Sequence, residues 1–226
     1  EMPFSFDSGH EFIRQDTAHL EFGAVRAGYA WIFPKRGKIN VGAGAFNHQS
    51  AKKIYGAGLG PALRQAVVDY LRALDVPVNP PELRFWMHPL PIWAGREPLS
   101  TPDGELLLAG DAAGLINPFF GDGIMHAVRS GKIAADCLLN DAPGSYTAEI
   151  HACYARNFDA AYNWMNWFYR FPRAGYKIGV SRESATRTAM RLLSGDLLWH
   201  DVAPRLRRRL IAYLLQKPLS EFWRKK

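Results

Sequence analysis

The stretch LLLAGDAAGLINPFFGDGIMHAVRSGK, residues 106–132, predicts a strand, a loop and a helix in that order. Its start, Leu106 to Ala109, is a short, continuous apolar run bounded by a turn, which is typical of a buried strand in a parallel sheet. After the loop, apolar and small residues recur at helical spacing, and we expect them to form one buried face: Ile124, Ala127, Val128, Gly131, Ala134, Ala135 and Leu138. The small residues of this face favour close packing of the helix on a sheet.

The loop has the parts of a ligand site. A helix N-terminus concentrates unpaired backbone N–H groups and a partial positive charge, so it favours an anion. Gly121 and Gly123 flank the predicted helix start, where the absence of a Cβ lets a bulky ligand approach the backbone. Asp111 follows the strand and Gly110, at the strand end where α/β sheets bind ligands, and its carboxylate can accept from hydroxyls. A loop that merely caps a helix could use the same residues.

The remaining elements follow from periodicity and turn residues. Residues 17–46 are the most strand-like part and predict a hairpin that turns near Gly37. A helix of about four turns is predicted from Pro61 until the chain reaches Pro77, and one strand around Leu83 to Met87. Ser145 is a candidate cap for a long aromatic helix that ends before Pro172, and two or three short helices should follow.

We therefore expect a mixed α/β (α+β) fold in three parts. Residues 1–95 would form a substrate-binding sheet, residues 96–142 the strand-loop-helix segment, and residues 143–226 a helical region. The composition is that of a globular protein, with 48% hydrophobic and 22% charged residues among 226. Neither a membrane-spanning run nor a signal peptide is recognisable, so we expect a cytoplasmic protein. The two cysteines, Cys137 and Cys153, are expected to be buried free thiols.

Charge is unevenly distributed along the chain. Residues 1–150 contain 13 Lys and Arg against 16 Asp and Glu, whereas residues 151–226 contain 15 against 5. The basic end predicts an anionic partner, which charge alone leaves open as a membrane surface contacted peripherally, a nucleic acid or an anionic substrate, or else a solvated helical face. Aromatic residues from Trp164 to Phe171 and the apolar residues beside Arg205 to Arg209 suit helix packing or an interfacial helix.

The sequence GDAAGLINPFFGDGI, followed by SGKIAAD, resembles the second FAD-binding segment of the para-hydroxybenzoate-hydroxylase-like flavoproteins. The resemblance implies an incomplete FAD-binding α/β domain in this chain. It also implies that Asp111 binds the ribityl chain, that Pro118 belongs to a loop beside the isoalloxazine, and that the helix end stabilises negative charge on the reduced flavin. The cofactor-binding residues that it assigns are Gly110, Asp111, Pro118, Gly121, Asp122, Gly123 and Ile124.

A second motif narrows the family. YAWIFPKRGKINVGAG, residues 29–44, resembles the Tyr-x-Trp-x-Phe-Pro, spacer, Gly-x-Gly signature of geranylgeranyl reductases, and HPLPIW, residues 88–93, resembles their next substrate-side segment. By this resemblance Tyr29, Trp31 and Phe33 are candidate walls of a prenyl cavity, and Pro34, Gly42 and Gly44 shape the turn. His88 and Pro89 complete the substrate-binding candidates. Without the resemblance, alternating rings on one face of a strand would indicate ordinary core.

The amino-terminal fingerprint of these flavoproteins is not recognisable. No G-x-G-x-x-G motif follows a strand, because GAGAFN at 42 and GAGLGP at 56 have the wrong spacing and context. The resemblance therefore corresponds to the carboxyl-terminal part of a family member. We expect a domain of about 150 residues to be missing, which leaves three alternatives: a fragment, a truncated gene product, or half of a split enzyme whose N-terminal half is on another chain.

The sequence assigns no catalytic residue and no metal site. The seven histidines have no cysteine or second histidine at ligand spacing, so a metal is not expected. His126, in the first turn after the loop, is the one histidine of interest, although a partly exposed helix residue would look the same. Neither a nucleophile elbow nor a P-loop is recognisable.

The resemblance implies an FAD-dependent reductase that transfers hydride to C=C bonds of an isoprenoid chain, with NAD(P)H or a similar donor reducing the flavin. A related FAD-dependent monooxygenase would use the same loop. A different class is a non-catalytic half of a split flavoprotein that binds a partner or a membrane. An isoprenoid or prenyl-lipid substrate is expected for the first class, and nucleic acid for none of them.

Overall fold

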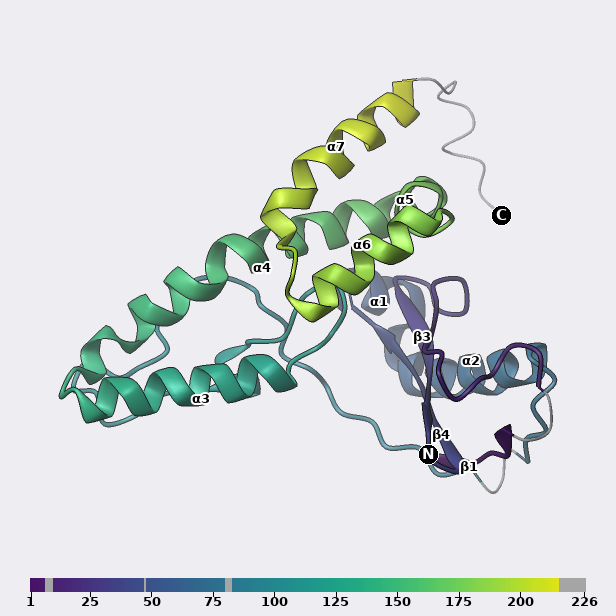
Figure 1. Cartoon of the computed structure of the whole chain (residues 1–226), viewed down its shortest axis with the longest axis horizontal. Helices are drawn as coiled ribbons and strands as arrows, with labels where there is room; N and C mark the ends of the chain where they lie inside the picture. Colours follow the sequence, from purple (N-terminus) through teal and green to yellow (C-terminus); the bar gives the residue numbers. More distant parts are fainter. Residues whose placement is uncertain (7–9, 47, 80–82, 216–226) are drawn as a thin grey trace. The chain divides into compact units, whose positions relative to one another are not determined.

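The computed structural model describes residues 1–6, 10–46, 48–79 and 83–215 and divides them into two compact units (Figure 1). The first unit is Glu1–His88 and the second is Pro89–Lys226. The first contains a small antiparallel sheet and two helices, and the second is mainly helical. The expected mixed α/β class is confirmed.

The sheet of the first unit is built around the predicted hairpin. Strands β3 (Gly28–Lys35) and β4 (Lys38–Ala45) pair antiparallel and turn at Gly37, whose φ of +67° suits glycine. The short strands β1 (Met2–Pro3) and β2 (His19–Glu21) complete the order β1-β4-β3-β2. All three pairings are antiparallel.

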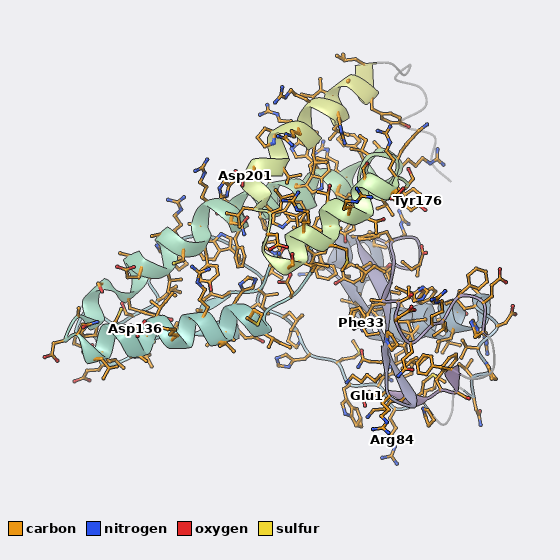
Figure 2. The ribbon with its side chains drawn as sticks, viewed as in Figure 1. Glu1, Phe33, Arg84, Asp136, Tyr176 and Asp201 are labelled. Carbon is orange, nitrogen blue, oxygen red and sulfur yellow. The ribbon has the colours of Figure 1, made fainter. Side chains whose placement is uncertain are left out.

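Helix α2 (Leu59–Ala73) covers one face of this sheet, as its apolar periodicity requires. Val67 and Leu71 on the helix pack with Ile32 and Ile39 of the hairpin in one buried cluster. Helix α1 (His48–Tyr55) and the short 3₁₀ turn η2 (Gly56–Gly58) precede α2. The opposite side chains of β3, among them Phe33, project from the other face (Figure 2).

The predicted strand at Leu83 to Met87 is wrong, because these residues have no strand partner in the described part of the chain. Trp86 is 82% exposed, so the apolar residues of this stretch do not indicate a buried strand. The buried parallel strand expected at Leu106 to Ala109 is also wrong. Leu107 makes a single antiparallel bridge to Ser100, and Leu106 is 55% exposed. An apolar run becomes a strand only where neighbouring strands form hydrogen bonds with its backbone. Among the described residues, this run forms a single β-bridge.

The second unit begins with irregular chain and the 3₁₀ turn η4 (Gly110–Ala113), and continues with helix α3 (Ile124–Leu139), turn η5 (Pro143–Ser145) and helix α4 (Tyr146–Arg170). Helices α5 (Pro172–Gly179), α6 (Glu183–Ser194) and α7 (Trp199–Leu215) follow (Figure 1). The helices over these ranges were predicted. The capping role of Ser145 was not correct, because its hydroxyl donates to the carbonyl oxygen of Ala142, 2.9 Å away.

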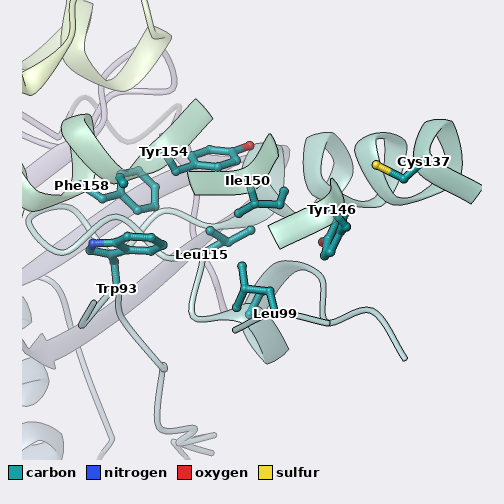
Figure 3. Packing of buried hydrophobic residues seen from close by; sticks show 10 residues of the cluster. Trp93, Leu99, Leu115, Cys137, Tyr146, Ile150, Tyr154 and Phe158 are labelled. Atoms are coloured by element: carbon teal, nitrogen blue, oxygen red, sulfur yellow. The ribbon is translucent and has the colours of Figure 1, made fainter. Parts of the chain in front are cut away.

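The core of this unit joins the irregular segment to α3 and α4 (Figure 3). Trp93, Leu115 and Phe158 meet in it, and the indole N–H of Trp93 donates to Asp159 at 2.8 Å. Burial raises the pKa of the Tyr146 hydroxyl, which donates to the carbonyl oxygen of Leu108 at 2.7 Å. Of the two free cysteines, Cys137 is buried as expected, whereas Cys153 is exposed.

Helix α3 does not bury the face that its sequence predicts. Ile124, Val128 and Leu138 are 83%, 64% and 55% exposed, whereas Ser130 and Cys137 are buried. The inward face is instead formed by Ser130, Ile133, Ala134 and Cys137, which are buried or pack against the core of this unit. Helical spacing in a sequence identifies the residues that share one face of a helix, but not whether another element covers that face.

Candidate functional site

The Gly-Asp turn of η4 lies directly against the first turn of α3. Gly110 has a φ of +55°, and a Cβ added to it would lie 2.8 Å from the Cβ of Ala127. Both the backbone conformation and the close approach require glycine. Gly110 thus determines how near Asp111 lies to the helix start.

Ser130 fastens this contact and was not predicted from the sequence. Its hydroxyl accepts from the Gly110 N–H at 2.9 Å and donates to the Ala127 carbonyl oxygen at 3.0 Å. The side chain is fully buried. Its only signal in the sequence is a hydroxyl three residues after Ala127, on the same side of the helix.

Ser130→Ala should destabilise the protein by about 1–2 kcal/mol, because the buried Gly110 N–H loses its acceptor. Urea unfolding of the variant and the wild type measures this difference. Ser184→Ala, at an exposed position on α6, is the matched control and should change stability by less than about 0.5 kcal/mol. Equal midpoints for all three proteins would show that the hydroxyl does not hold the turn.

The proline loop is organised by Asn117, which is 4% exposed. Its side-chain oxygen accepts from the N–H groups of Phe119 and Phe120 at 3.0 and 3.4 Å, and its backbone pairs with Gly121 and Asp122. Pro118 is fully buried, so a ligand beside this loop would meet backbone and not the proline ring. Asn117 is a second residue that the motif analysis missed.

Asp111 and Gly123 lie side by side at the start of α3. A Cβ built on Gly123 would be 3.4 Å from Asp111 Oδ1 and 3.1 Å from Ile116 Cγ1. The helix has no side-chain cap at this end, and Ile124 and Met125 there are 83% and 73% exposed. A carboxylate, an uncapped helix N-terminus and a glycine cradle can together bind a ligand that has both hydroxyl and anionic groups.

Asp122, between the two glycines of the turn, forms a pair with His126 in the first turn of α3. His126 Nε2 lies 3.2 Å from Asp122 Oδ2, and the imidazole ring contacts the rings of Tyr154 and Phe158 edge-on. Burial raises the pKa of Tyr154 to about 12, so its hydroxyl stays neutral. The second Asp122 oxygen, Oδ1, is buried without a hydrogen-bond partner among the described residues. Such an atom favours an additional polar group at the turn.

The aromatic residues of the hairpin form a continuous row in the first unit. Ring centroids of Tyr29 and Trp31 are 6.0 Å apart, and those of Trp31 and Phe33 are 6.2 Å apart. Tyr29 is buried and stacks on Phe46, whereas Phe33 is 39% exposed. The row of rings is thus an apolar surface whose exposure is greater at Phe33 than at Tyr29.

Gly42 and Gly44 do not shape the turn, as was expected, because residues 36 and 37 form it. They lie within β4, opposite Trp31 and Tyr29. A Cβ on Gly42 would come within 2.2 Å of the Trp31 ring, so the indole lies over bare backbone. Trp31 is fixed there by a 2.9 Å hydrogen bond from its Nε1 to Asn40 Oδ1. Pro34 lies in β3, paired with Ile39, and not in the turn.

The predicted residues therefore gather in two separate places. Asp111, Pro118 and the Gly121 to Ile124 segment meet in the second unit. The ring row lies in the first unit. His88 and Pro89 are exposed and occupy the last position of one unit and the first position of the other.

The basic end of the chain buries its apolar residues. Ten Lys and Arg against three Asp and Glu occur over residues 170–215. Val202 and Leu210 of α7 are 8% and 3% exposed, which favours helix packing over insertion of this face into a lipid interface. Trp167 is 47% exposed. Among the described residues, no helix has the length and apolar character needed to cross a bilayer.

The chain is similar to several reductases over part of its length. A menaquinone reductase of Mycolicibacterium smegmatis is 31% identical over 154 residues, which are 64% of this chain and 36% of that protein. A chloroplastic geranylgeranyl diphosphate reductase of Oryza sativa subsp. japonica is 28% identical over 62% of this chain and 27% of its own length. A digeranylgeranylglycerophospholipid reductase of Methanocella arvoryzae is 29% identical, over 66% and 38%.

The chain thus spans about a third of the length of the curated relatives it matches, with shares of 36%, 27% and 36% for three of them. No family model matches the chain. No solved structure matches it significantly. The partial matches confirm the resemblance that the two motifs predicted: over about 60% of its length this chain is similar, at about 30% identity, to reductases of the geranylgeranyl reductase type, and the resemblance is to their carboxyl-terminal part.

Proposed function

We propose that this chain provides the flavin-side loop and part of the prenyl-binding wall of an FAD-dependent reductase that acts on C=C bonds of an isoprenoid chain. The relatives named above are reductases whose named substrates, geranylgeranyl diphosphate, digeranylgeranylglycerophospholipid and menaquinone, all contain a polyprenyl chain. Menaquinone also has a reducible ring, so the shared feature is the prenyl group. We therefore propose a prenyl lipid as the substrate class.

The observation that carries the flavin assignment is the contact of Asp111 with Gly123 at an uncapped helix start. The residues fit the group: Asp111 can accept from ribityl hydroxyls, and the first N–H groups of α3 can donate to the pyrimidine edge. Gly121, Asp122, Gly123 and Ile124 form the adjoining backbone, and the unpartnered Asp122 Oδ1 provides another acceptor. When bound, reduced FAD would supply hydride from its N5 to one carbon of the prenyl double bond, a proton would go to the other carbon, and NAD(P)H would be the donor that restores the reduced cofactor.

The chain's own part in the chemistry would be positioning and exclusion of water. The ring row of Tyr29, Trp31 and Phe33 offers an apolar surface with few polar atoms, because the one indole N–H at its centre is already bonded to Asn40. Such a surface binds a hydrocarbon chain without placing charge against it. The positive end of α3 would stabilise negative charge at the pyrimidine edge.

The exposed apolar residues of α3 favour a second candidate function, a non-catalytic half that binds a protein partner. Ile124, Val128 and Leu138 form an apolar stripe that is exposed to solvent. Contiguous apolar patches on a protein surface often mark binding sites. In that case the loop alone would not retain FAD. FAD binding therefore distinguishes the two proposed functions.

If the reductase proposal is correct, purified protein that includes the expected amino-terminal part of the FAD site should be yellow, with flavin absorbance near 450 nm and about one equivalent of FAD. With NAD(P)H and a geranylgeranyl lipid, the product should be a saturated chain, detected as a mass gain of two hydrogens per bond. A hydroxylated product would instead indicate a monooxygenase. A colourless protein that takes up no added FAD even with that amino-terminal part present would contradict the reductase proposal and favour the partner-binding half.

A further inference from the structure

We infer that Trp199, the first residue of α7, is a positioning residue that holds the flavin-side loop through the rings of Phe119 and Phe120. The role toward a cofactor rests on the proposed function, whereas the contact with the loop does not. Nothing in the motif comparison assigns a part in the site to α7. The inference gives the carboxyl-terminal helices a direct connection with the loop.

Ring contacts join the loop to α7 and α4. The Trp199 ring lies 4.8 Å from the ring of Phe119 and 5.6 Å from that of Phe120, measured between centroids. Phe119 also meets Phe168 of α4 edge-on at 5.3 Å. All four side chains are buried, at 2–6% exposure. The two loop rings are therefore held between rings of two helices, Phe168 and Trp199, which lie about 50 and 80 residues later in the chain.

Trp199 is itself fixed by α4. The Asn157 side-chain oxygen accepts from the Trp199 backbone N–H at 2.6 Å, which satisfies one of the free donors at the start of α7. Val202 and Leu210 bury the next turns of the same helix. The indole is thus attached to a rigid support and not to a loop.

The other support, Phe168, depends on a glycine of α5. A Cβ on Gly175 would lie 2.8 Å from Phe168 Cδ2, so the ring occupies space that only glycine leaves free. Two independent helices therefore press on the same loop ring. This arrangement limits the movement of Phe119 in two directions.

The consequence for the site follows from the loop's hydrogen bonds. Phe119 and Phe120 donate their N–H groups to Asn117, and Gly121 donates to the carbonyl oxygen of the same residue. Movement of the rings would therefore strain the bonds that place Gly121, and with it the turn before α3. Trp199 would therefore act on the glycine turn through these residues.

The indole N–H gives a means to separate packing from hydrogen bonding. Trp199 Nε1 is buried without a hydrogen-bond partner in the described part of the chain. Trp199→Phe removes this unsatisfied donor and keeps an aromatic ring, so it should preserve the loop. Trp199→Leu keeps apolar bulk but loses the ring contacts, and Trp199→Ala loses both.

Hydrogen–deuterium exchange of the whole chain, read by mass spectrometry, tests the inference without a cofactor. In Trp199→Ala we expect the amides of Asn117 and of residues 119–123 to exchange about tenfold faster than in the wild type, because their opening costs less free energy. Trp199→Phe should exchange within about twofold of the wild type. If the alanine variant does not fold, Trp199→Leu should exchange at least about threefold faster than Trp199→Phe.

Leu210→Ala is the matched control, because Leu210 is equally buried in α7 but has no ring contact with the loop. It should lower the unfolding temperature and leave exchange at 117–123 within about twofold of wild type. Loop exchange in the Trp199 variants no faster than in this control would overturn the inference. FAD titration then tests the link with function: Trp199→Ala should bind about tenfold more weakly than wild type. If the wild type binds no FAD even with the amino-terminal part of the site present, the proposed function fails, and the exchange result still decides the role of Trp199.

Discussion

Asp111→Ala is expected to weaken FAD binding by about tenfold to a hundredfold, because a carboxylate that accepts from a ligand hydroxyl contributes roughly 1.5–3 kcal/mol. The position of Asp111 explains why the loss should not be compensated. Its Oδ1 lies next to Gly123, at a helix start with no side-chain cap. Fluorescence titration of the chain with FAD measures the affinity.

Asp136→Ala is the matched control for this experiment. Asp136 is also an aspartate of the same unit, exposed along α3 and paired with Lys132 at 2.6 Å (Figure 2). Such a surface pair contributes only about 0.3–0.5 kcal/mol, so the control should bind FAD like the wild type. Asp111→Asn, which keeps one acceptor oxygen, should lie between. Equal affinity of Asp111→Ala and Asp136→Ala would remove Asp111 from the site.

Local patterns predicted the elements that are stabilised within a short stretch of chain. Alternation of rings and the turn at Gly37 predicted the β3–β4 hairpin, and helical spacing predicted α2, α3 and α4. These features depend on neighbours two to four residues apart, which a sequence displays directly. The long helices could therefore be predicted without knowing which elements they pack against.

Distant partners decided the features that the sequence did not predict. Leu106 to Ala109 is as apolar as a buried strand, yet its described neighbours supply one bridge, to Ser100. The exposed stripe of α3 has the same spacing as a buried one. Ser130 and Trp199 contact the loop over separations of 20 and about 80 residues, so no local pattern marks them. The motifs gave the candidates for the site, and the tertiary contacts show what holds them in place.

The glycine signature illustrates a different limit, because the resemblance assigned its glycines a structural role that the fold does not give them. Gly42 and Gly44 were assigned to a turn, since glycine commonly forms turns. In the structure Gly42 lies opposite Trp31, and its missing side chain provides the space for the indole. A glycine in a strand interior often marks such a close approach. The signature is therefore one unit in which large rings on β3 pair with small residues on β4.

Gly42→Ala should destabilise the first unit by about 3 kcal/mol, the upper range for overpacking, because its Cβ would lie 2.2 Å from the Trp31 ring. The indole cannot move aside without losing its hydrogen bond to Asn40. Urea unfolding measures the change. Gly60→Ala, in α2 of the same unit, is the matched control: its Cβ would meet Met87 at an ordinary 3.4 Å, so stability should change little or rise.

A double-mutant cycle separates the ring contact from a general intolerance of β4 to side chains. In a Trp31→Ala background the space over Gly42 is open, so Gly42→Ala should cost less than about 1 kcal/mol there. The coupling of roughly 2 kcal/mol between the two positions would show that the glycine exists to accommodate the ring. A cost that is the same in both backgrounds would show instead that the strand backbone requires glycine for its own reasons. The ring row would then lose its structural link with the Gly-x-Gly part of the signature, and with it the argument that the two form one apolar wall.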